Sequence, residues 1–199
     1  AILSGIYFQV GHGEILMLLM LTPTLAVIIT RLVTREGWHD LLLHPHFRGN
    51  IRWYLFSYLA TPVISYLGAG LFFLLMPQLW DPLGSYFARS IEATSMGDYL
   101  GMLATVAPLA ALVNPLFGLV TCLGEEFAWR GYLFPKLCKQ TSVLKATLIS
   151  SIIWGIWHAP IIVTGFNYGT DHPVWGCLAQ VGFCLVLGGI FSWLTLRVN

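Results

Sequence analysis

Charged residues are what this sequence has least of. Only 10% of its 199 residues are Asp, Glu, Lys or Arg, whereas soluble globular domains carry about 25%. Hydrophobic residues make up 57% of the chain, and its mean hydropathy is +0.75. This composition excludes a disordered tail, an ordinary soluble enzyme and a nucleic-acid-binding protein with a basic face. We therefore expect a membrane protein whose partners include the lipid bilayer and no nucleic acid.

Cysteine is also scarce, and the common catalytic motifs are absent. The four cysteines form no Cys-x-x-Cys pair, which excludes a disulfide framework and a zinc ribbon. The sequence has no His-Glu-x-x-His, no Gly-x-Ser-x-Gly elbow and no Gly-rich phosphate loop,. These absences argue against the zinc and serine peptidases that carry such motifs. We expect neither a metal ion nor a cofactor.

Long uncharged runs fill most of the chain. A helix needs about 20 apolar residues to cross a bilayer, and four runs exceed that length, at 53–80, 99–124, 146–170 and 172–196. A shorter run at 15–30 is completed by Leu32 and Val33 if Arg31 extends to the interface,. Residues 1–13 are apolar but too short to cross. The pattern predicts an all-α, polytopic membrane helix bundle with five full spans and an N-terminal partial span. It forms one membrane-embedded domain over 1–199, incomplete at both ends.

The charges divide between the two sides of this bundle. The loop from Arg31 to Arg52, the loop from Glu125 to Lys145 and Arg197 hold all but Arg89 of the ten basic residues. The positive-inside rule therefore places both loops in the cytoplasm. We expect an integral, multi-pass protein of the plasma (inner) membrane. In the first loop, residues 37–47 mix Trp, Leu and His with few charges, which predicts a short interfacial helix.

Two ionisable features stand out against this background, because a charge at the centre of a membrane helix costs about 2.5–3.5 kcal/mol. The first is the pair Glu125–Glu126, directly after the run 99–124. On a helix, Glu126 and Arg130 are spaced i,i+4 and form a favourable ion pair. Glu125 lies about 100° away around the axis and gains no basic partner, which leaves it available as a general base. The alternative is a solvated acid pair at a helix end, balanced by Arg130.

The second feature is His158, within the run 146–170 and close to Trp154 and Trp157. A histidine in such an apolar segment needs a hydrogen-bond partner. If the helices that carry Glu125 and His158 are antiparallel neighbours, the two side chains can share a cavity and deprotonate a water molecule. The alternative is an ordinary buried histidine with a satisfied hydrogen bond.

These residues resemble the motifs of a known family. Glu125-Glu126-x-x-x-Arg130-Gly131-Tyr132-Leu133, followed by Trp154-x-x-x-His158, is similar to motifs of the CPBP membrane proteins, the CAAX protease and bacteriocin-processing family related to type II CAAX prenyl endopeptidases. Residues 22–26 and 34–37 also look like the family's early region.

The resemblance implies an intramembrane, glutamate-dependent endopeptidase that acts on a peptide or a membrane protein. In this interpretation Glu125 activates the water that attacks the peptide carbonyl, and His158 orients that water. Glu126 and Arg130 hold the helix end in place. Trp154 stands where the family commonly has Phe.

The sequence departs from the family at its third motif, a His followed four residues later by Asn or Asp, which donates hydrogen bonds to the oxyanion. His172 is followed at that spacing by Gly176, and the chain ends at 196–199, where the connection to the motif's helix is expected. The resemblance thus implies truncation before the third motif. Loss of an oxyanion donor typically costs about 10²–10³ in rate, so we expect this length of chain to be inactive without the missing helix.

Two alternatives belong to other functional classes. A non-catalytic membrane scaffold of the same fold predicts that Glu125 is dispensable. A metal-binding or transport protein that uses Glu125 and His158 as ligands predicts sensitivity to chelators.

Overall fold

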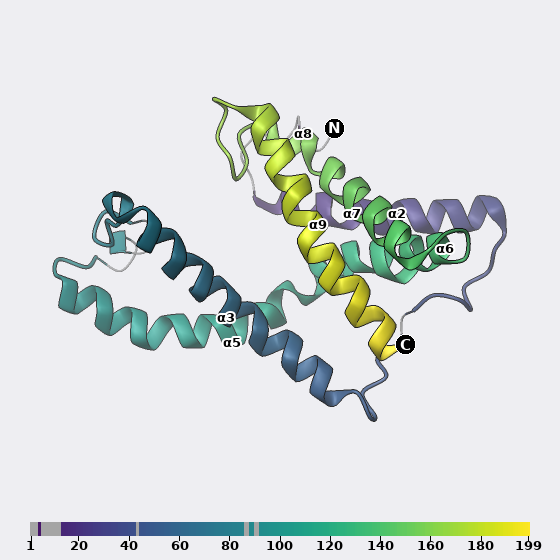
Figure 1. The fold of residues 1–199 in the computed structure, drawn as a ribbon, viewed down its shortest axis with the longest axis horizontal. Coiled ribbons are helices and arrows are strands. Elements are labelled where there is room, and N and C mark those ends of the chain that lie inside the picture. Colours follow the sequence, from purple (N-terminus) through teal and green to yellow (C-terminus); the bar gives the residue numbers. More distant parts are fainter. Residues whose placement is uncertain (1–3, 5–12, 43, 86–87, 90–91) are drawn as a thin grey trace. The chain divides into compact units, whose positions relative to one another are not determined.

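The computed structural model describes residues 4, 13–42, 44–85, 88–89 and 92–199, and this part of the chain is helical without β-strands (Figure 1). Its elements are α2 (Gly13–Thr34), α3 (Ile51–Leu75), η1 (Pro77–Leu79), α5 (Met96–Ala128), η2 (Trp129–Leu133), α6 (Phe134–Cys138), α7 (Val143–Trp157), α8 (Ala159–Ile162) and α9 (Pro173–Val198). The predicted all-α membrane fold is confirmed. The predicted partial span at 1–13 lies almost entirely outside the described residues.

Within the described residues, four helical segments are long and apolar enough to cross a membrane: Ile15–Thr34, Ile51–Leu75, Met96–Cys138 and Pro173–Val198. They correspond to four of the five predicted full spans. The predicted span at 146–170 is shorter in the structure, because α7 has 15 residues and ends at Trp157. Pro160 follows closely and has no N–H to continue the helical hydrogen bonds. The four-residue α8 and a loop then complete the connection to α9.

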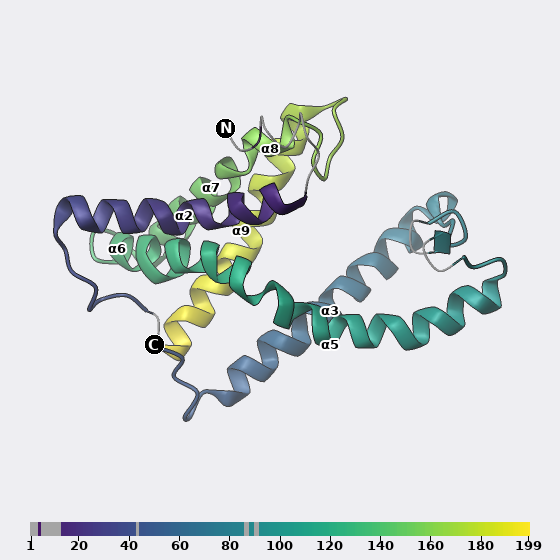
Figure 2. The ribbon, with the colours of Figure 1, turned by 180° about the vertical axis from the view of Figure 1, so that it is seen from behind.

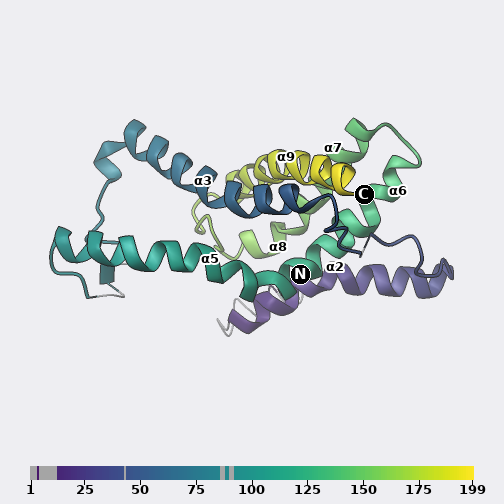
Figure 3. The same cartoon turned by 90° about the horizontal axis from the view of Figure 1, so that it is seen from below.

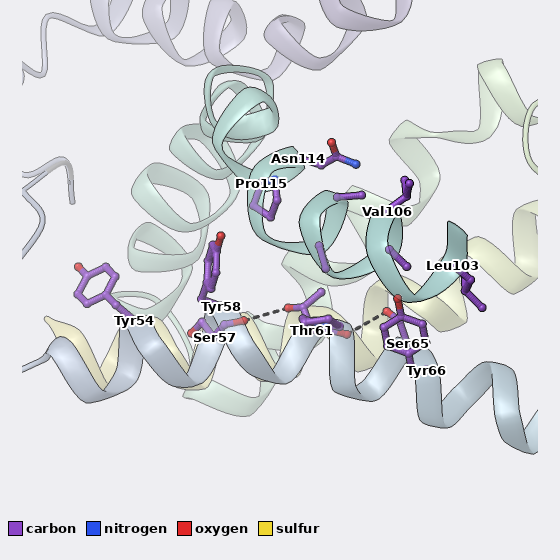
Figure 4. A pocket seen from close by; sticks show the side chains of 14 residues that line it. Tyr54, Ser57, Tyr58, Thr61, Ser65, Tyr66, Leu103, Val106, Asn114 and Pro115 are labelled. Carbon is purple, nitrogen blue, oxygen red and sulfur yellow. Dashed lines mark hydrogen bonds between the residues drawn. The ribbon is translucent and has the colours of Figure 1, made fainter. Parts of the chain in front are cut away.

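The described chain divides into two compact units, residues 47–119 and residues 1–46 with 120–199. The single domain expected from the sequence stays a prediction. In the first unit, α3 and the first part of α5 line a pocket of about 840 Å³ (Figure 4). The Thr61 and Ser65 hydroxyls in its wall donate to the carbonyls of Ser57 and Thr61, at 3.0 and 2.9 Å. Their donor protons are therefore used within α3.

In the second unit, α7 and α9 pack along each other (Figures 1 and 2). Two glycines allow their close approach. A Cβ at Gly155 would lie 2.7 Å from the Cα of Val181, and a Cβ at Gly188 would lie 1.9 Å from the Ser151 hydroxyl. Because Gly155 meets Val181 while Ser151 meets Gly188, the two helices are antiparallel.

The same unit contains a close contact between α2 and the last turns of α5 (Figure 3). A Cβ at Gly124 would lie 2.9 Å from the carbonyl oxygen of Met20. The Thr24 hydroxyl donates to the Gly124 carbonyl at 2.5 Å. Gly124 directly precedes the acid pair, so this contact fixes the helix end that carries Glu125 and Glu126.

Residues 37–47 do not form the predicted interfacial helix: their described residues are turns and irregular chain. Arg35 and Gly37 have φ values of 55° and 73°, which a right-handed helix does not accommodate. Side-chain bonds also compete for this segment. The Arg31 guanidinium, 2% exposed, donates to the Gly37 carbonyl and pairs with Asp40 at 2.6 Å. Arg31 thereby lowers the pKa of the Asp40 carboxyl.

Ion pairs connect this segment to the chain after α5. Glu36 pairs with Lys136 and accepts a hydrogen bond from the Tyr132 hydroxyl at 3.3 Å. The Lys136 ammonium lowers the pKa of the Glu36 carboxyl. Lys139 lies 3.6 Å from Asp40. The two segments predicted as loops are partly helical, since Arg31 lies within α2 and Glu125 within α5. Their ion pairs show that they meet at the same end of this unit.

Candidate active site

Glu125, Glu126, Trp154 and His158 line one cavity of about 480 Å³. The two glutamates come from the last turn of α5, and the other two residues from the end of α7. Most of the remaining wall is apolar and comes from α2, α8 and α9. The structure thus brings together four of the five residues singled out in the sequence, although Glu125 and His158 are far apart along the chain.

Glu125 is buried, with 7% of its surface exposed. Its Oε2 accepts a hydrogen bond from the indole Nε1 of Trp154 at 2.8 Å. The Trp154 indole is not a basic partner, in line with the expectation for Glu125, but it does form a hydrogen bond with the carboxylate. An indole N–H donates without neutralising the charge, so Glu125 keeps acceptor capacity for another donor.

Glu126 forms the ion pair that its i,i+4 spacing predicts, with Arg130 Nη1 2.8 Å from Glu126 Oε1. Arg130 lies beside the cavity and is itself 7% exposed. Its guanidinium stacks over the rings of Trp154 and Phe191, at 4.3 and 4.9 Å from their centroids. Contacts of this kind compensate for removing a cation from water. Arg130 therefore connects the end of α5 to both α7 and α9.

The chain widens into a π-helical turn, η2, directly after the acid pair. The turn contains Arg130 and Gly131, so the motif that begins at Glu125 in α5 continues into η2. Trp129 at its start is buried and packs edge-on against Trp157, with ring centroids 6.1 Å apart. Single π turns occur frequently at functional sites. Here the turn contacts both α7 and α9.

His158 lies at the C-terminal end of α7, with its Nδ1 2.9 Å from the Trp154 carbonyl oxygen. Because a carbonyl can only accept, Nδ1 carries the proton in this contact. In the neutral ring, Nε2 is then an acceptor. The Trp157 ring packs edge-on against His158 at 4.7 Å and restricts its orientation.

Two residues that help to build the site were missed in the sequence. Gly124 permits the close contact with α2, and its place directly before two acids in an apolar helix was the available signal,. Gln180 lines the cavity from α9 and is 6% exposed. The rule that singled out His158, a polar side chain inside an apolar run, also applies to Gln180.

Among the residues that the structure describes, no group of three or more His, Cys, Asp or Glu side chains is arranged to hold a metal ion.

Comparisons with known proteins agree with the motifs. Residues 106–199 match the family described as type II CAAX prenyl endopeptidase Rce1-like. Over 203 aligned residues, the chain is 26% identical to CAAX prenyl protease 2 of Methanococcus maripaludis, an alignment that covers 98% of this chain and 70% of that protein. No solved structure matches. The match over residues 106–199 and the similarity to a CAAX prenyl protease support a peptidase, and the long apolar helices support a multi-pass membrane protein.

Proposed function

We propose that the cavity shared by Glu125 and His158 is the active site of an intramembrane endopeptidase in which these two residues activate water. One observation carries the proposal: Trp154 contacts both side chains at the cavity wall. Its indole N–H donates to Glu125 and its carbonyl accepts from His158, at 2.8 and 2.9 Å. The acceptor carboxylate and the imidazole therefore both belong to residues that line one cavity of about 480 Å³.

In the proposed reaction, a water molecule donates one hydrogen bond to Glu125 and the other to Nε2 of His158. Glu125 takes a proton as the water oxygen bonds to the peptide carbonyl carbon. The C–N bond then breaks, and Glu125 returns the proton to the leaving amine. General base catalysis of this kind contributes about 10²–10⁴ in rate.

Glu126, Arg130 and Trp154 are positioning residues in this proposal. Arg130 is only 7% exposed, and its positive charge is compensated by the ion pair with Glu126. Removal of one partner of a buried pair typically costs about 3–5 kcal/mol, and we expect a smaller cost here because the Glu126 side chain is 32% exposed. The pair therefore supports the helix end without taking part in the proton transfer.

The proposed substrate is a peptide or a membrane protein. The curated relative is named a CAAX prenyl protease, and the mainly apolar cavity wall suits a substrate that approaches through the bilayer. We further propose a plasma (inner) membrane location with the loops that begin at Arg31 and Glu125 in the cytoplasm. Their basic residues and the ion pairs between them support a common side,.

The test is proteolysis by the protein at the length that its gene encodes, reconstituted in lipid vesicles. Glu125→Gln keeps the shape of the side chain and removes the base, so we expect at least a 10²-fold loss of cleavage rate. His158→Ala should also abolish cleavage. Asp171→Asn, an exposed acid that does not line the cavity, is the matched control and should be active.

Full cleavage by Glu125→Gln would overturn the mechanism. A protein that keeps its biological role with Glu125→Gln while it cleaves nothing would instead indicate the scaffold. Loss of activity on chelation, restored by a metal ion, would indicate the metal-dependent alternative.

A further inference from the structure

Gln180 is a polar side chain of the cavity that the proposed reaction does not yet use. It lies on α9, a helix apolar enough to span a membrane, and is 6% exposed. A carboxamide in such a place is costly unless its polar atoms are hydrogen-bonded. The amide oxygen and the amide nitrogen of Gln180 have very different partners.

The oxygen of Gln180 is well satisfied, and the nitrogen is not. Oε1 accepts from the Tyr168 hydroxyl at 3.1 Å. Nε2 lies 3.6 Å from the sulfur of Cys184, which is a weak acceptor. An amide nitrogen carries two hydrogens, so the nitrogen keeps donor capacity at the cavity wall.

Tyr168 fixes which end of the amide faces the cavity as a donor. In the structure the Tyr168 hydroxyl donates to Oε1, which places the amide oxygen on the Tyr168 side. Tyr168 is itself held against α9, because a Cβ at Gly176 would lie 2.9 Å from the Tyr168 Cβ. The orientation of Gln180 is therefore set by the loop between α8 and α9.

A peptide bond in this cavity needs a donor for its carbonyl oxygen. Glu125 and Nε2 of His158 are acceptors, and the Trp154 N–H is already used by Glu125. Asn167 also lines the cavity but is exposed. Among the described lining residues, Gln180 is the amide that combines burial with donor capacity.

We propose that the Gln180 carboxamide, oriented by Tyr168, donates a hydrogen bond to the carbonyl oxygen of the scissile peptide bond. The inference rests on the proposed function. The bond strengthens as the carbonyl oxygen becomes an oxyanion, which stabilises the transition state more than the ground state.

The test measures kcat and KM for an internally quenched peptide, with the gene-length protein in lipid vesicles. Gln180→Met keeps the length of the side chain and removes the donor, so kcat should fall about 10²–10³-fold with KM little changed. Tyr168→Phe should give a smaller loss of kcat in the same direction. Ser192→Ala is the matched control: Ser192 is buried on α9, lacks a hydrogen-bond partner in the described chain and does not line the cavity.

Glu125→Gln, measured in parallel, separates this inference from the proposed function. An inactive Glu125→Gln with Gln180→Met within about twofold of the wild type overturns the role of Gln180 and leaves the function standing. An active Glu125→Gln overturns both. If Gln180→Met unfolds, Tyr168→Phe decides: reduced kcat at unchanged unfolding temperature supports the inference, and wild-type kcat overturns it.

Discussion

Trp154 contacts three other residues of the candidate site. Its indole nitrogen binds Glu125, its carbonyl binds His158, and its ring lies under the guanidinium of Arg130. A phenylalanine at this position would keep the aromatic face and the backbone carbonyl. The N–H donor would be lost together with part of the ring volume, so a second Trp→Phe variant is needed to account for the smaller ring.

We expect Trp154→Phe to fold and to cleave more slowly. A hydrogen bond to a charged group contributes about 1.5–3 kcal/mol, which corresponds to a loss of roughly 10- to 100-fold in kcat if the bond positions Glu125 in the transition state. The measurement is the steady-state rate in vesicles. Trp157→Phe changes the neighbouring indole of the cavity without touching a Glu125 bond, and should cost less. Equal rates for the two variants would contradict the role given to the indole N–H.

The residues of the site were more predictable than their contacts. The i,i+4 spacing of Glu126 and Arg130 is a property of one helix, and the structure contains that pair. The bond from Trp154 to Glu125 joins two helices, and local spacing carries no information about it. Gln180 and Gly124 depend in the same way on which helices are neighbours.

At the scale of the elements, the contact between α7 and α9 places His158 and Gln180 in one cavity. Gly155 is essential to that contact, because its missing side chain lets the backbone of Val181 approach. Close approach through small residues is the usual way in which membrane helices associate.

We therefore expect Gly155→Ala to lower the free energy of unfolding by about 1–3 kcal/mol, the usual cost of overpacking. Thermal unfolding of the purified protein in detergent measures the change. The control is Gly182→Ala on α9, where an added Cβ meets nothing within 4 Å. Equal unfolding temperatures for both variants would show that α7 and α9 do not pack as closely as described.

Hydropathy predicted the long helices well and the short ones badly. A run of apolar residues predicts the helix Ile51–Leu75, because a helix that spans a bilayer requires little more than a sufficient length of apolar sequence,. The run 146–170 is equally apolar, yet α7 ends at Trp157 because Pro160 lacks an N–H,. The segment 37–47 is no helix because positive φ values and the Arg31–Asp40 pair impose another path.

At the scale of the whole molecule, the basic residues and the ion pairs both place the segments that begin at Arg31 and at Glu125 on one side of the membrane. Glu36 pairs with Lys136 and Asp40 lies near Lys139, so the two loops cannot lie on opposite sides of a bilayer. In the proposed topology, the positive-inside rule places that side in the cytoplasm.

We expect single cysteines at Arg48 and Gln140 to be protected from an impermeant maleimide in sealed right-side-out vesicles. Cysteines at Gln78 and Asp171 should react in the same vesicles. All four positions are exposed in the structure, and the background replaces the four native cysteines with serine. Inverted vesicles should reverse the pattern. Reaction of Gln140 and Asp171 from one side would contradict the topology.

Glu125 and Glu126 are adjacent carboxylates, and the proposed mechanism depends on Glu125 being the base. The most direct measurement is the cleavage rate per folded molecule of Glu125→Gln and Glu126→Gln, determined in the same vesicles and normalised by circular dichroism. Glu126→Gln leaves Arg130 unpaired, so we expect a less stable protein that still cleaves, whereas Glu125→Gln should fold normally and lose at least 10²-fold in rate. Normal cleavage by Glu125→Gln, with loss confined to Glu126→Gln, would contradict the account.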